Sequence, residues 1–330
     1  MTSHLWPVYG HDWAVEHLRK GMANGRIRHA YLIVGPESVG KNALAHALAQ
    51  ALNCTGEHSP CGQCRSCRLI ASGNHPDLLY SELDPGTGVL RIEEVRSVTG
   101  RIALKPYEAR YRIAIFRDFD HAQPRAQDAL LKTLEEPPPA AVLILLAPTT
   151  EALLATITSR SQVISLRLVP AETICDILIE RWNADPQQAA LLARLSGGRI
   201  GWAIRALEDP SLLDQRQQAL DLLEQALSQN RGGRFALAED LSKDKLALAP
   251  LLELWQTYWR DVLLLAEGSK VSPANIDRED SLRQLARAIS PQDALAALRA
   301  TRETLHNLVY NLNLRLALEV MFLDYPGLAR

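Results

Sequence analysis

The chain has 330 residues, of which 47% are hydrophobic and 22% charged, so it is long enough for two or three globular domains. Its formal net charge is -2, so the chain is not basic overall and its net charge does not indicate nucleic-acid binding. A local basic patch or a basic partner subunit could still bind nucleic acid. No run approaches the roughly 20 apolar residues of a spanning helix, and the N-terminus lacks a signal pattern, so we expect no membrane association and a cytoplasmic location.

The first half of the chain alternates short apolar runs with helical patterns, which is typical of a parallel sheet covered by helices. Strands are predicted at residues 30–34, 78–81, 112–116, 142–147 and 163–168. Helices are predicted at residues 42–52 and at 127–136, where three prolines end the second one. The pattern predicts an α/β core over residues 1–168.

Beyond Pro170 the strand pattern disappears and nearly every segment has helical periodicity. A small helical lid domain is predicted at 169–209 and an all-helical C-terminal domain at 210–330. In the latter, Trp255 and Trp259 recur at one-face spacing, which favours a bundle core, and residues 268–275 form a predicted break.

The segment Gly35-Pro36-Glu37-Ser38-Val39-Gly40-Lys41-Asn42 follows a predicted strand and opens a predicted helix, which is the context of a phosphate-binding P-loop. Backbone N–H groups between Gly35 and Gly40 would cradle phosphates, and Lys41 would reach the β- and γ-phosphates. The last position is normally Ser or Thr, whose hydroxyl ligates Mg²⁺. Asn42 is a poor replacement, because an amide lacks that hydroxyl.

A second departure follows the predicted strand at 112–116. P-loop enzymes carry an acidic pair there, which holds Mg²⁺ and orients the attacking water. Here the strand leads into Arg117-Asp118-Phe119-Asp120, so a cation takes the first acidic position, and a shift by one residue leaves Phe119 beside Asp118. The alternative interpretation is that Asp118 and Asp120 cap the next helix.

Cys54, Cys61, Cys64 and Cys67 have the spacing Cys-x6-Cys-x2-Cys-x2-Cys, which suits one tetrahedral Zn²⁺. Four thiolates leave no open position, so a structural zinc site is predicted rather than a catalytic one. An iron–sulfur cluster or reduced thiols without a metal remain alternatives.

Together these elements resemble the AAA+ clamp-loader subunits of bacterial DNA polymerase III over nearly the whole chain. The matching segments are Gly10-His11-Asp12, Arg28-His29-Ala30-Tyr31-Leu32, the P-loop with its cysteine module, His75-Pro76-Asp77, residues 129–138, Ser159-Arg160-Ser161 and residues 311–319. The resemblance implies a AAA+ P-loop core with a parallel sheet, a small helical lid and a C-terminal helical collar. It also implies gamma/tau and delta subunits as partners, with the sliding clamp and primed DNA reached through the complex.

Within this family, gamma/tau subunits hydrolyse ATP, whereas delta prime subunits share the fold but commonly lack ATPase activity. Asn42 and Arg117 depart from the ATP-hydrolysing pattern, and Gly201 stands where those members carry a phosphate-sensing arginine, unless Arg199 is the residue in register. These departures favour the delta prime type, and ATP binding at Gly35, Gly40, Lys41 and Asn42 stays open.

The segment Ser159-Arg160-Ser161 resembles the Ser-Arg-Cys motif of the family, with the cysteine replaced. The resemblance implies that Arg160 acts in trans as an arginine finger, neutralising charge on the phosphate transferred in a neighbouring subunit. An active gamma/tau-like or stand-alone ATPase is the first alternative, since Lys41 is retained. A zinc-dependent nucleic-acid-binding module is the second, and it predicts salt-sensitive DNA affinity.

Overall fold

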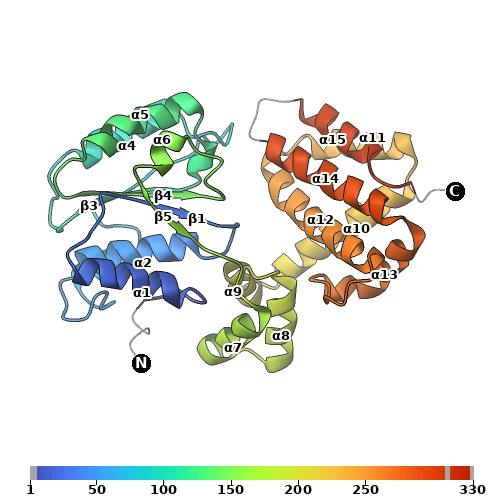
Figure 1. Cartoon of the computed structure of the whole chain (residues 1–330), viewed down its shortest axis with the longest axis horizontal. Coiled ribbons are helices and arrows are strands. Elements are labelled where there is room, and N and C mark those ends of the chain that lie inside the picture. Colours follow the sequence, from blue (N-terminus) through green and yellow to red (C-terminus); the bar gives the residue numbers. More distant parts are fainter. Residues whose placement is uncertain (1–5, 309–312, 328–330) are drawn as a thin grey trace. The chain divides into compact units, whose positions relative to one another are not determined.

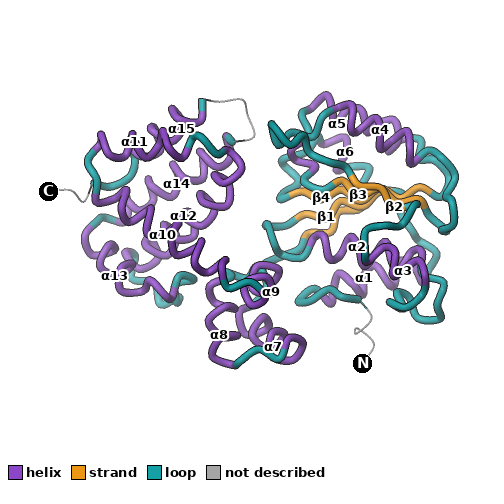
Figure 2. The backbone as a smooth tube through the Cα atoms, turned by 180° about the vertical axis from the view of Figure 1, so that it is seen from behind, coloured by secondary structure: helices purple, strands orange, loops and turns teal. Residues whose placement is uncertain are grey.

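Helices cover both faces of a parallel β-sheet in the N-terminal part of the computed structural model, which describes residues 6–308 and 313–327 (Figures 1 and 2). The described strands are β1 (Ala30–Val34), β2 (Leu78–Tyr80), β3 (Arg112–Phe116), β4 (Ala141–Ala147) and β5 (Gln162–Ser165). Their order is β2-β3-β4-β1-β5, and neighbouring strands pair in parallel. The predicted α/β P-loop fold is confirmed.

Two differences from the predicted elements have a physical cause. The strand β5 ends at Ser165 rather than at residue 168, because the chain leaves the sheet and the Val169 N–H donates to the Gly198 carbonyl at 2.9 Å. The helix predicted at 127–136 begins earlier, at Pro124, a residue whose missing N–H is not needed in the first turn.

Helices pack on each face of the sheet around separate hydrophobic cores. The helices of this part are α1 (Asp12–Ala23), α2 (Lys41–Asn53), α3 (Arg65–Ala71), α4 (Ile92–Ile102), α5 (Pro124–Glu135), α6 (Ala155–Thr158) and α7 (Ala171–Trp182), with a 3₁₀ turn, η2 (Phe119–His121). Figure 1 shows α1 and α2 on one face and α4 and α5 on the other. The strand β4 is buried along its whole length, as its apolar sequence requires.

The strand order determines where the P-loop lies. Because β1 lies between β4 and β5, the loop that follows it leaves the interior of the sheet at the edge where the carboxyl ends of the parallel strands meet. The segment after β3 emerges at the same edge. The two segments with unusual residues, 35–42 and 117–120, are thereby brought to one side of the core.

The chain forms two compact units, residues 1–182 with 198–202 and residues 183–197 with 203–330. The described elements of the second unit are all helical: α8 (Pro186–Leu195), most of α9 (Ile200–Glu208), α10 (Ser211–Ser228), α11 (Arg231–Leu241), α12 (Lys245–Ala266), η3 (Ile276–Arg278), α13 (Glu279–Ala288), α14 (Pro291–Asn307) and α15 (Leu314–Leu323). The all-helical C-terminal region is confirmed, whereas the division into domains at 1–168, 169–209 and 210–330 stays a prediction.

The core of the second unit is aromatic. Trp255 and Trp259 are fully buried, and the Trp255 indole donates to the Ala219 carbonyl at 2.8 Å, so the prediction of a bundle core is confirmed. The predicted break at 268–275 lies between α12 and η3. Residues 311 and 312 of the segment matched to the collar lie outside the described residues, and the rest of that segment leads into α15. Among the described helices, none has the length and apolar character needed to cross a bilayer.

Candidate functional site

The P-loop follows β1 and continues into the first two residues of α2 (Figure 1). Gly35 has φ 154°, and a Cβ there would lie 2.7 Å from the Leu166 carbonyl oxygen, so the position requires glycine. The Lys41 ammonium donates to the carbonyls of Gly35 at 2.6 Å and Pro36 at 2.9 Å. The lysine predicted to bind phosphate is therefore bonded to the loop that carries it.

The segment Gly10-His11-Asp12 also supports the P-loop. His11 precedes α1, and its Nε2 lies 2.8 Å from the Val39 carbonyl oxygen, to which it donates. Burial lowers the pKa of His11, although the hydrogen bond to Val39 and the charge of Asp12 oppose that effect, so the ring is neutral at neutral pH. This contact fixes the loop from the side of the N-terminal helix.

Arg117, the cation at the first acidic position, is held against the P-loop helix. Its guanidinium carbon lies 4.4 Å from the centroid of the Tyr80 ring, and its Nη2 lies 3.5 Å from His46 Nε2. His46 lies on α2 one turn after Asn42, on the same face of the helix. Burial and the positive charge of Arg117 lower the pKa of His46, so the neutral ring accepts from the arginine.

The two acids that follow Arg117 do not form the pair of an active P-loop enzyme. Asp118 adopts φ 46° before η2 and makes no side-chain capping bond, so its interpretation as a helix cap is wrong. Asp120 is largely buried, which raises its pKa, although the nearby charges of His121 and Lys41 oppose that effect. Burial thus disfavours the charged form of this carboxyl.

Gly201 lies directly against the P-loop. Its N–H donates to the Ser38 carbonyl at 2.8 Å, and a Cβ at this position would lie 2.8 Å from the same oxygen. Any side chain at position 201 would require the two backbones to separate. The first turn of α9 and the P-loop therefore touch through backbone atoms.

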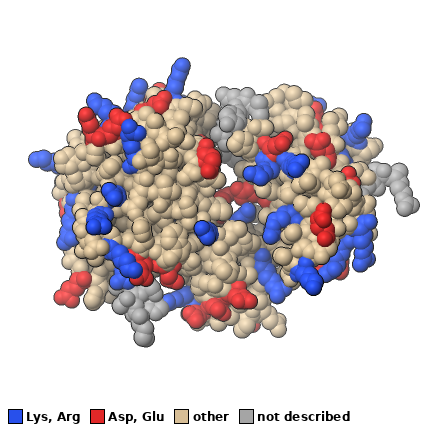
Figure 3. Space-filling model, viewed as in Figure 1, with Lys and Arg blue, Asp and Glu red and all other residues tan. Residues whose placement is uncertain are grey.

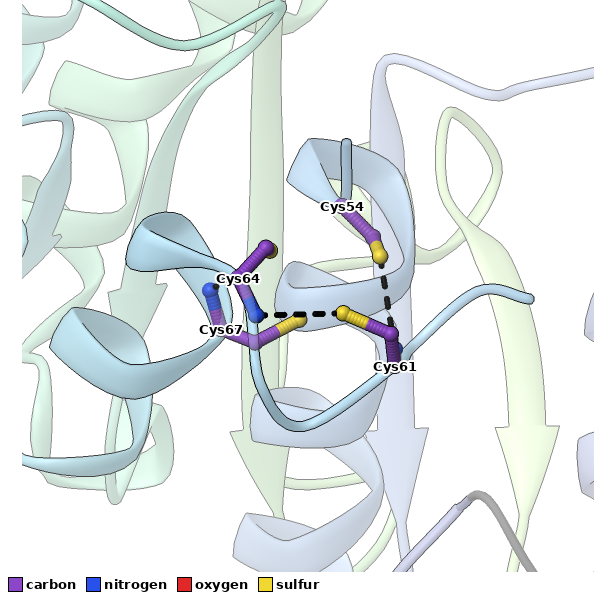
Figure 4. Close-up of side chains that lie close together, drawn as sticks. All are labelled: Cys54, Cys61, Cys64 and Cys67. Atoms are coloured by element: carbon purple, nitrogen blue, oxygen red, sulfur yellow. Dashed lines mark hydrogen bonds between the residues drawn. The ribbon is translucent and has the colours of Figure 1, made fainter. Parts of the chain in front are cut away.

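The four predicted metal ligands converge between α2 and α3 (Figure 4). The Sγ atoms of Cys54, Cys61, Cys64 and Cys67 all lie within 4.8 Å of one another. Tetrahedral Zn²⁺ with Zn–S bonds of about 2.3 Å places its sulfurs roughly 3.8 Å apart, so small side-chain adjustments bring the four sulfurs to a metal. The cluster is a site that could hold a metal ion.

Backbone N–H groups around the cluster favour thiolates. The N–H groups of Gly56 and Cys61 donate to Cys54 Sγ, that of Cys64 to Cys61 Sγ, and that of Cys67 to Cys64 Sγ, at 3.2–3.4 Å. Burial opposes ionisation of Cys64, but the hydrogen bonds outweigh it and lower its pKa to about 6. Burial raises the pKa of Cys67, so a metal would have to displace the proton of that thiol.

Arg160 lies on the surface of the first unit, just after α6. Its side chain is 38% exposed, and its Nη2 lies 2.9 Å from Glu135 Oε1 at the end of α5. Its Nη1 donates to the Thr156 carbonyl at 3.1 Å and contacts Ser159 Oγ at 3.5 Å. The guanidinium is thus held by its own chain at a surface position.

The sequence did not predict the contacts of three residues that the fold brings to these sites. His46 and Tyr80 bind Arg117, and Glu135 binds Arg160. Of the three, only Glu135 could have been found from the sequence. An acid in the last turn of a helix interacts unfavourably with the helix dipole, which indicates that a cation lies nearby. The partners of Arg117 depend on which strands are neighbours, which the local sequence does not specify.

Comparisons with known proteins give the same family. A family model described as DNA polymerase III, delta subunit, matches residues 10–170. The delta prime subunit of Bacillus subtilis is 28% identical over 311 residues, which cover 93% of each chain. The delta prime subunit of Escherichia coli is 31% identical over 280 residues, 83% of this chain and 81% of that protein.

The tau subunit of Escherichia coli is 29% identical over 312 residues, which are 87% of this chain but only 48% of tau. The likeness to delta prime subunits extends over most of both chains, whereas tau has a further half that this chain does not match. With the P-loop fold and its altered residues, these matches show that the chain belongs to the family of DNA polymerase III delta prime subunits.

Proposed function

We propose that this chain is a clamp-loader subunit that does not hydrolyse ATP itself and supplies Arg160 to the ATP site of a neighbouring subunit. The observation that carries the proposal is the contrast between two arginines. Arg117 stands at the acidic position and contacts His46 on the P-loop helix and Tyr80, whereas Arg160 follows α6 and contacts Glu135 at the end of α5; both side chains are exposed. One arginine is incompatible with hydrolysis in this chain, and the other is accessible to a neighbour.

The charges around the P-loop disfavour hydrolysis in this chain. The Arg117 guanidinium lies 3.5 Å from His46, one turn along α2 from Asn42, where its positive charge repels Mg²⁺, and Asn42 has no hydroxyl to ligate the ion. The nearest alternative acid, Asp120, is largely buried, which raises its pKa and disfavours its charged form. Phosphate groups could still meet the P-loop N–H groups, but an activated Mg–ATP complex has no support from these residues.

The chemistry of the arginine side chain suits action in trans. A guanidinium offers two N–H groups to a phosphate at once, and it keeps its charge at every physiological pH. An arginine supplied by one subunit to another typically raises phosphoryl-transfer rates by about 10³–10⁵. A subunit can therefore lack ATPase activity in its own site and still be essential for hydrolysis in the site of its neighbour.

The partners in this proposal are gamma/tau and delta subunits, with the sliding clamp and primed DNA reached through the complex. The C-terminal helix α15 supports assembly through the second unit. Leu316, Val320 and Leu323 are each more than half exposed and recur at i, i+4 and i+7, so they share one face of the helix. Such an apolar face is typical of a subunit interface.

The cysteine cluster in this proposal holds structural Zn²⁺. Cys54 ends α2 and Cys64 caps α3, so a metal there would tie the P-loop helix to the next helix. We expect one zinc per chain by mass spectrometry under native conditions, and a lower midpoint of unfolding after treatment with a chelator. Iron in place of zinc, or a chain without metal that keeps its full stability, would contradict this part of the proposal.

A binding module for nucleic acid is less well supported. Figure 3 shows Asp and Glu side chains interspersed with Lys and Arg over much of the visible face. A protein that binds nucleic acid through the phosphate backbone needs a surface on which Lys and Arg outnumber Asp and Glu.

The ATPase activity of the purified chain tests directly whether its P-loop supports ATP hydrolysis. We expect no magnesium-dependent ATP turnover, because Asn42 and Arg117 leave the metal without ligands. Robust turnover, abolished by Lys41→Met, would instead favour an active gamma/tau-like ATPase.

A further inference from the structure

Glu135 is an acid in an unfavourable place for its own helix. It lies in the last turn of α5, where the unpaired carbonyls of the helix end repel negative charge. Its carboxylate lies 2.9 Å from Arg160, and that pair is the one ion pair found for Glu135 among the described residues. Helix stability does not account for an acid at this position, so the pairing with Arg160 is its evident role.

The fold itself brings the two residues together. Gln127 is buried within α5, and its Oε1 accepts from the Leu154 N–H at 2.9 Å, immediately before α6. Its Nε2 donates to the Ala122 carbonyl at 2.9 Å. The bond to Ala122 orients the Gln127 amide, and the bond from Leu154 fixes the start of α6 against α5, so the segment that carries Arg160 has a defined position relative to Glu135.

The two terminal nitrogens of the Arg160 guanidinium have different partners. Nη1 is bonded to Thr156 and Ser159 of its own segment, whereas Nη2 faces Glu135. A phosphate that engages the guanidinium with two bonds needs terminal N–H groups, and it carries negative charge itself. A carboxylate and a phosphate on the same nitrogen would repel each other, so the two compete for Arg160.

We infer that Glu135 is a positioning residue that holds Arg160 within the chain and must release it before the arginine reaches the phosphate of a neighbour. This inference rests on the proposed function of Arg160. The pair is suited to exchange, because the side chain of Glu135 is 52% exposed and that of Arg160 is 38% exposed. Exposed ion pairs are weak enough for a multiply charged phosphate to displace them.

The inference predicts a specific kinetic effect in the assembled complex. With Glu135→Gln, the phosphate no longer displaces a carboxylate, so the apparent KM for ATP falls by about 2- to 5-fold, the range expected for an exposed ion pair, while kcat does not fall. The shift shrinks at about 0.5 M salt, because salt screens exposed pairs. A role of Glu135 confined to folding would not produce this combination.

The experiment measures steady-state ATP turnover against ATP concentration, at low and high salt, in the complex reconstituted with gamma/tau and delta subunits. Glu136→Gln is the matched control, because it removes the same charge from the next residue, which is exposed and has no described ion pair. It should behave like the wild type. An unchanged or raised KM with Glu135→Gln, a reduced kcat, or an equal shift with Glu136→Gln would overturn the inference.

Arg160→Ala separates failure of this inference from failure of the proposed function. If Arg160→Ala leaves turnover unchanged, the proposed function is wrong, and the inference falls with it. If Arg160→Ala reduces turnover but Glu135→Gln matches the wild type, only the inference is wrong. In the double variant Arg160→Ala/Glu135→Gln, we expect no KM shift beyond that of Arg160→Ala, since the effect of Glu135 acts through the arginine.

Discussion

At the scale of single residues, Asp77 holds a loop next to the sheet through three backbone N–H groups. Its side chain is fully buried and accepts from Tyr107 at 2.6 Å, Glu108 at 2.9 Å and Ala109 at 3.0 Å. Burial alone would raise the pKa of this carboxyl, but the three bonds outweigh it and lower the pKa. The ionised form is therefore part of the folded structure.

We expect Asp77→Asn to destabilise the first unit by about 1–3 kcal/mol, because the amide presents one acceptor where the carboxylate presents two, and its NH₂ group faces backbone donors. Urea denaturation followed by circular dichroism measures the loss. Asp128→Asn, at an exposed position on α5, is the control and should cost less than about 0.5 kcal/mol. Equal effects of the two substitutions would argue against a special role for Asp77.

His75 gives a prediction for pH. Its Nδ1 accepts from the Asp77 N–H at 3.1 Å, and its other nitrogen lies 3.0 Å from Ser66 Oγ, so the folded state needs the neutral ring. Burial lowers the pKa of His75, against the opposing charges of Asp77 and Glu108. The unfolded chain therefore takes up a proton as the pH falls below about 6.5, while the folded chain does not.

The free energy of unfolding should thus decline as the pH falls from about 7 through 6.5 toward the lowered pKa of the folded state. His75→Gln should be less stable at pH 8 but show a shallower decline, which urea titrations between pH 8 and 5.5 will measure. Parallel pH profiles for the two proteins would show that His75 does not titrate as described.

The types of the site residues were predictable from the sequence, but their partners were not. The P-loop glycines, Lys41 and the cysteines were found because short motifs fix their spacing. The binding of Arg117 by His46 and Tyr80 could not be found, because it joins three segments through the strand order. The alternative interpretation of Asp118 as a helix cap was wrong, because its backbone enters the left-handed region just before the 3₁₀ turn and its side chain makes no capping bond.

At the scale of helices, Arg234 joins the ends of two elements in the second unit. The side chain is buried on α11, and its guanidinium donates to the carbonyls of Ala226 and Leu227 at the end of α10. It also donates to Phe322 at the end of α15 and to Tyr325 and Pro326 just beyond it. These carbonyls carry the partial negative charge of the helix ends, which a buried cation complements.

We expect Arg234→Met to cost about 2–4 kcal/mol in the second unit, because methionine fills the space but leaves several carbonyls without a donor. Arg231→Met, in the exposed first turn of the same helix, is the matched control. Hydrogen exchange should show faster opening of α10 and α15 for Arg234→Met alone. Exchange rates that do not differ between the variants would contradict the proposed cap.

Most elements could be predicted because their apolar runs are short, continuous and bounded by turn residues. The strands β1 and β3 have their predicted bounds, and Trp255 and Trp259 pack in the core as their spacing indicated. The end of β5 was misplaced because apolar residues continue after Ser165, while the backbone bonds to Gly198, which lies far away in sequence. The hydrophobic pattern predicts that the residues after Ser165 are buried, but it does not predict which residue their backbone hydrogen-bonds to.

At the scale of the whole molecule, the proposed function requires a P-loop core that does not hydrolyse ATP and surfaces through which the chain assembles with its partners. Arg117 contacts His46 on the P-loop helix, Arg160 lies at the surface of the first unit, and α15 presents an apolar face in the second. The sequence predicted the P-loop and the helical C-terminal region. It could not specify the division into two compact units, because Gly198–Trp202 packs with the first unit despite its position in the chain.

The most direct test compares Arg160→Ala with Lys41→Met in the reconstituted complex, by ATP turnover in the presence of primed DNA and clamp. The account predicts that Arg160→Ala reduces turnover at the affected site by at least about 10³-fold, whereas Lys41→Met leaves turnover of the complex unchanged. Loss of turnover with Lys41→Met and normal turnover with Arg160→Ala would contradict it, because hydrolysis would then take place in this chain's own site.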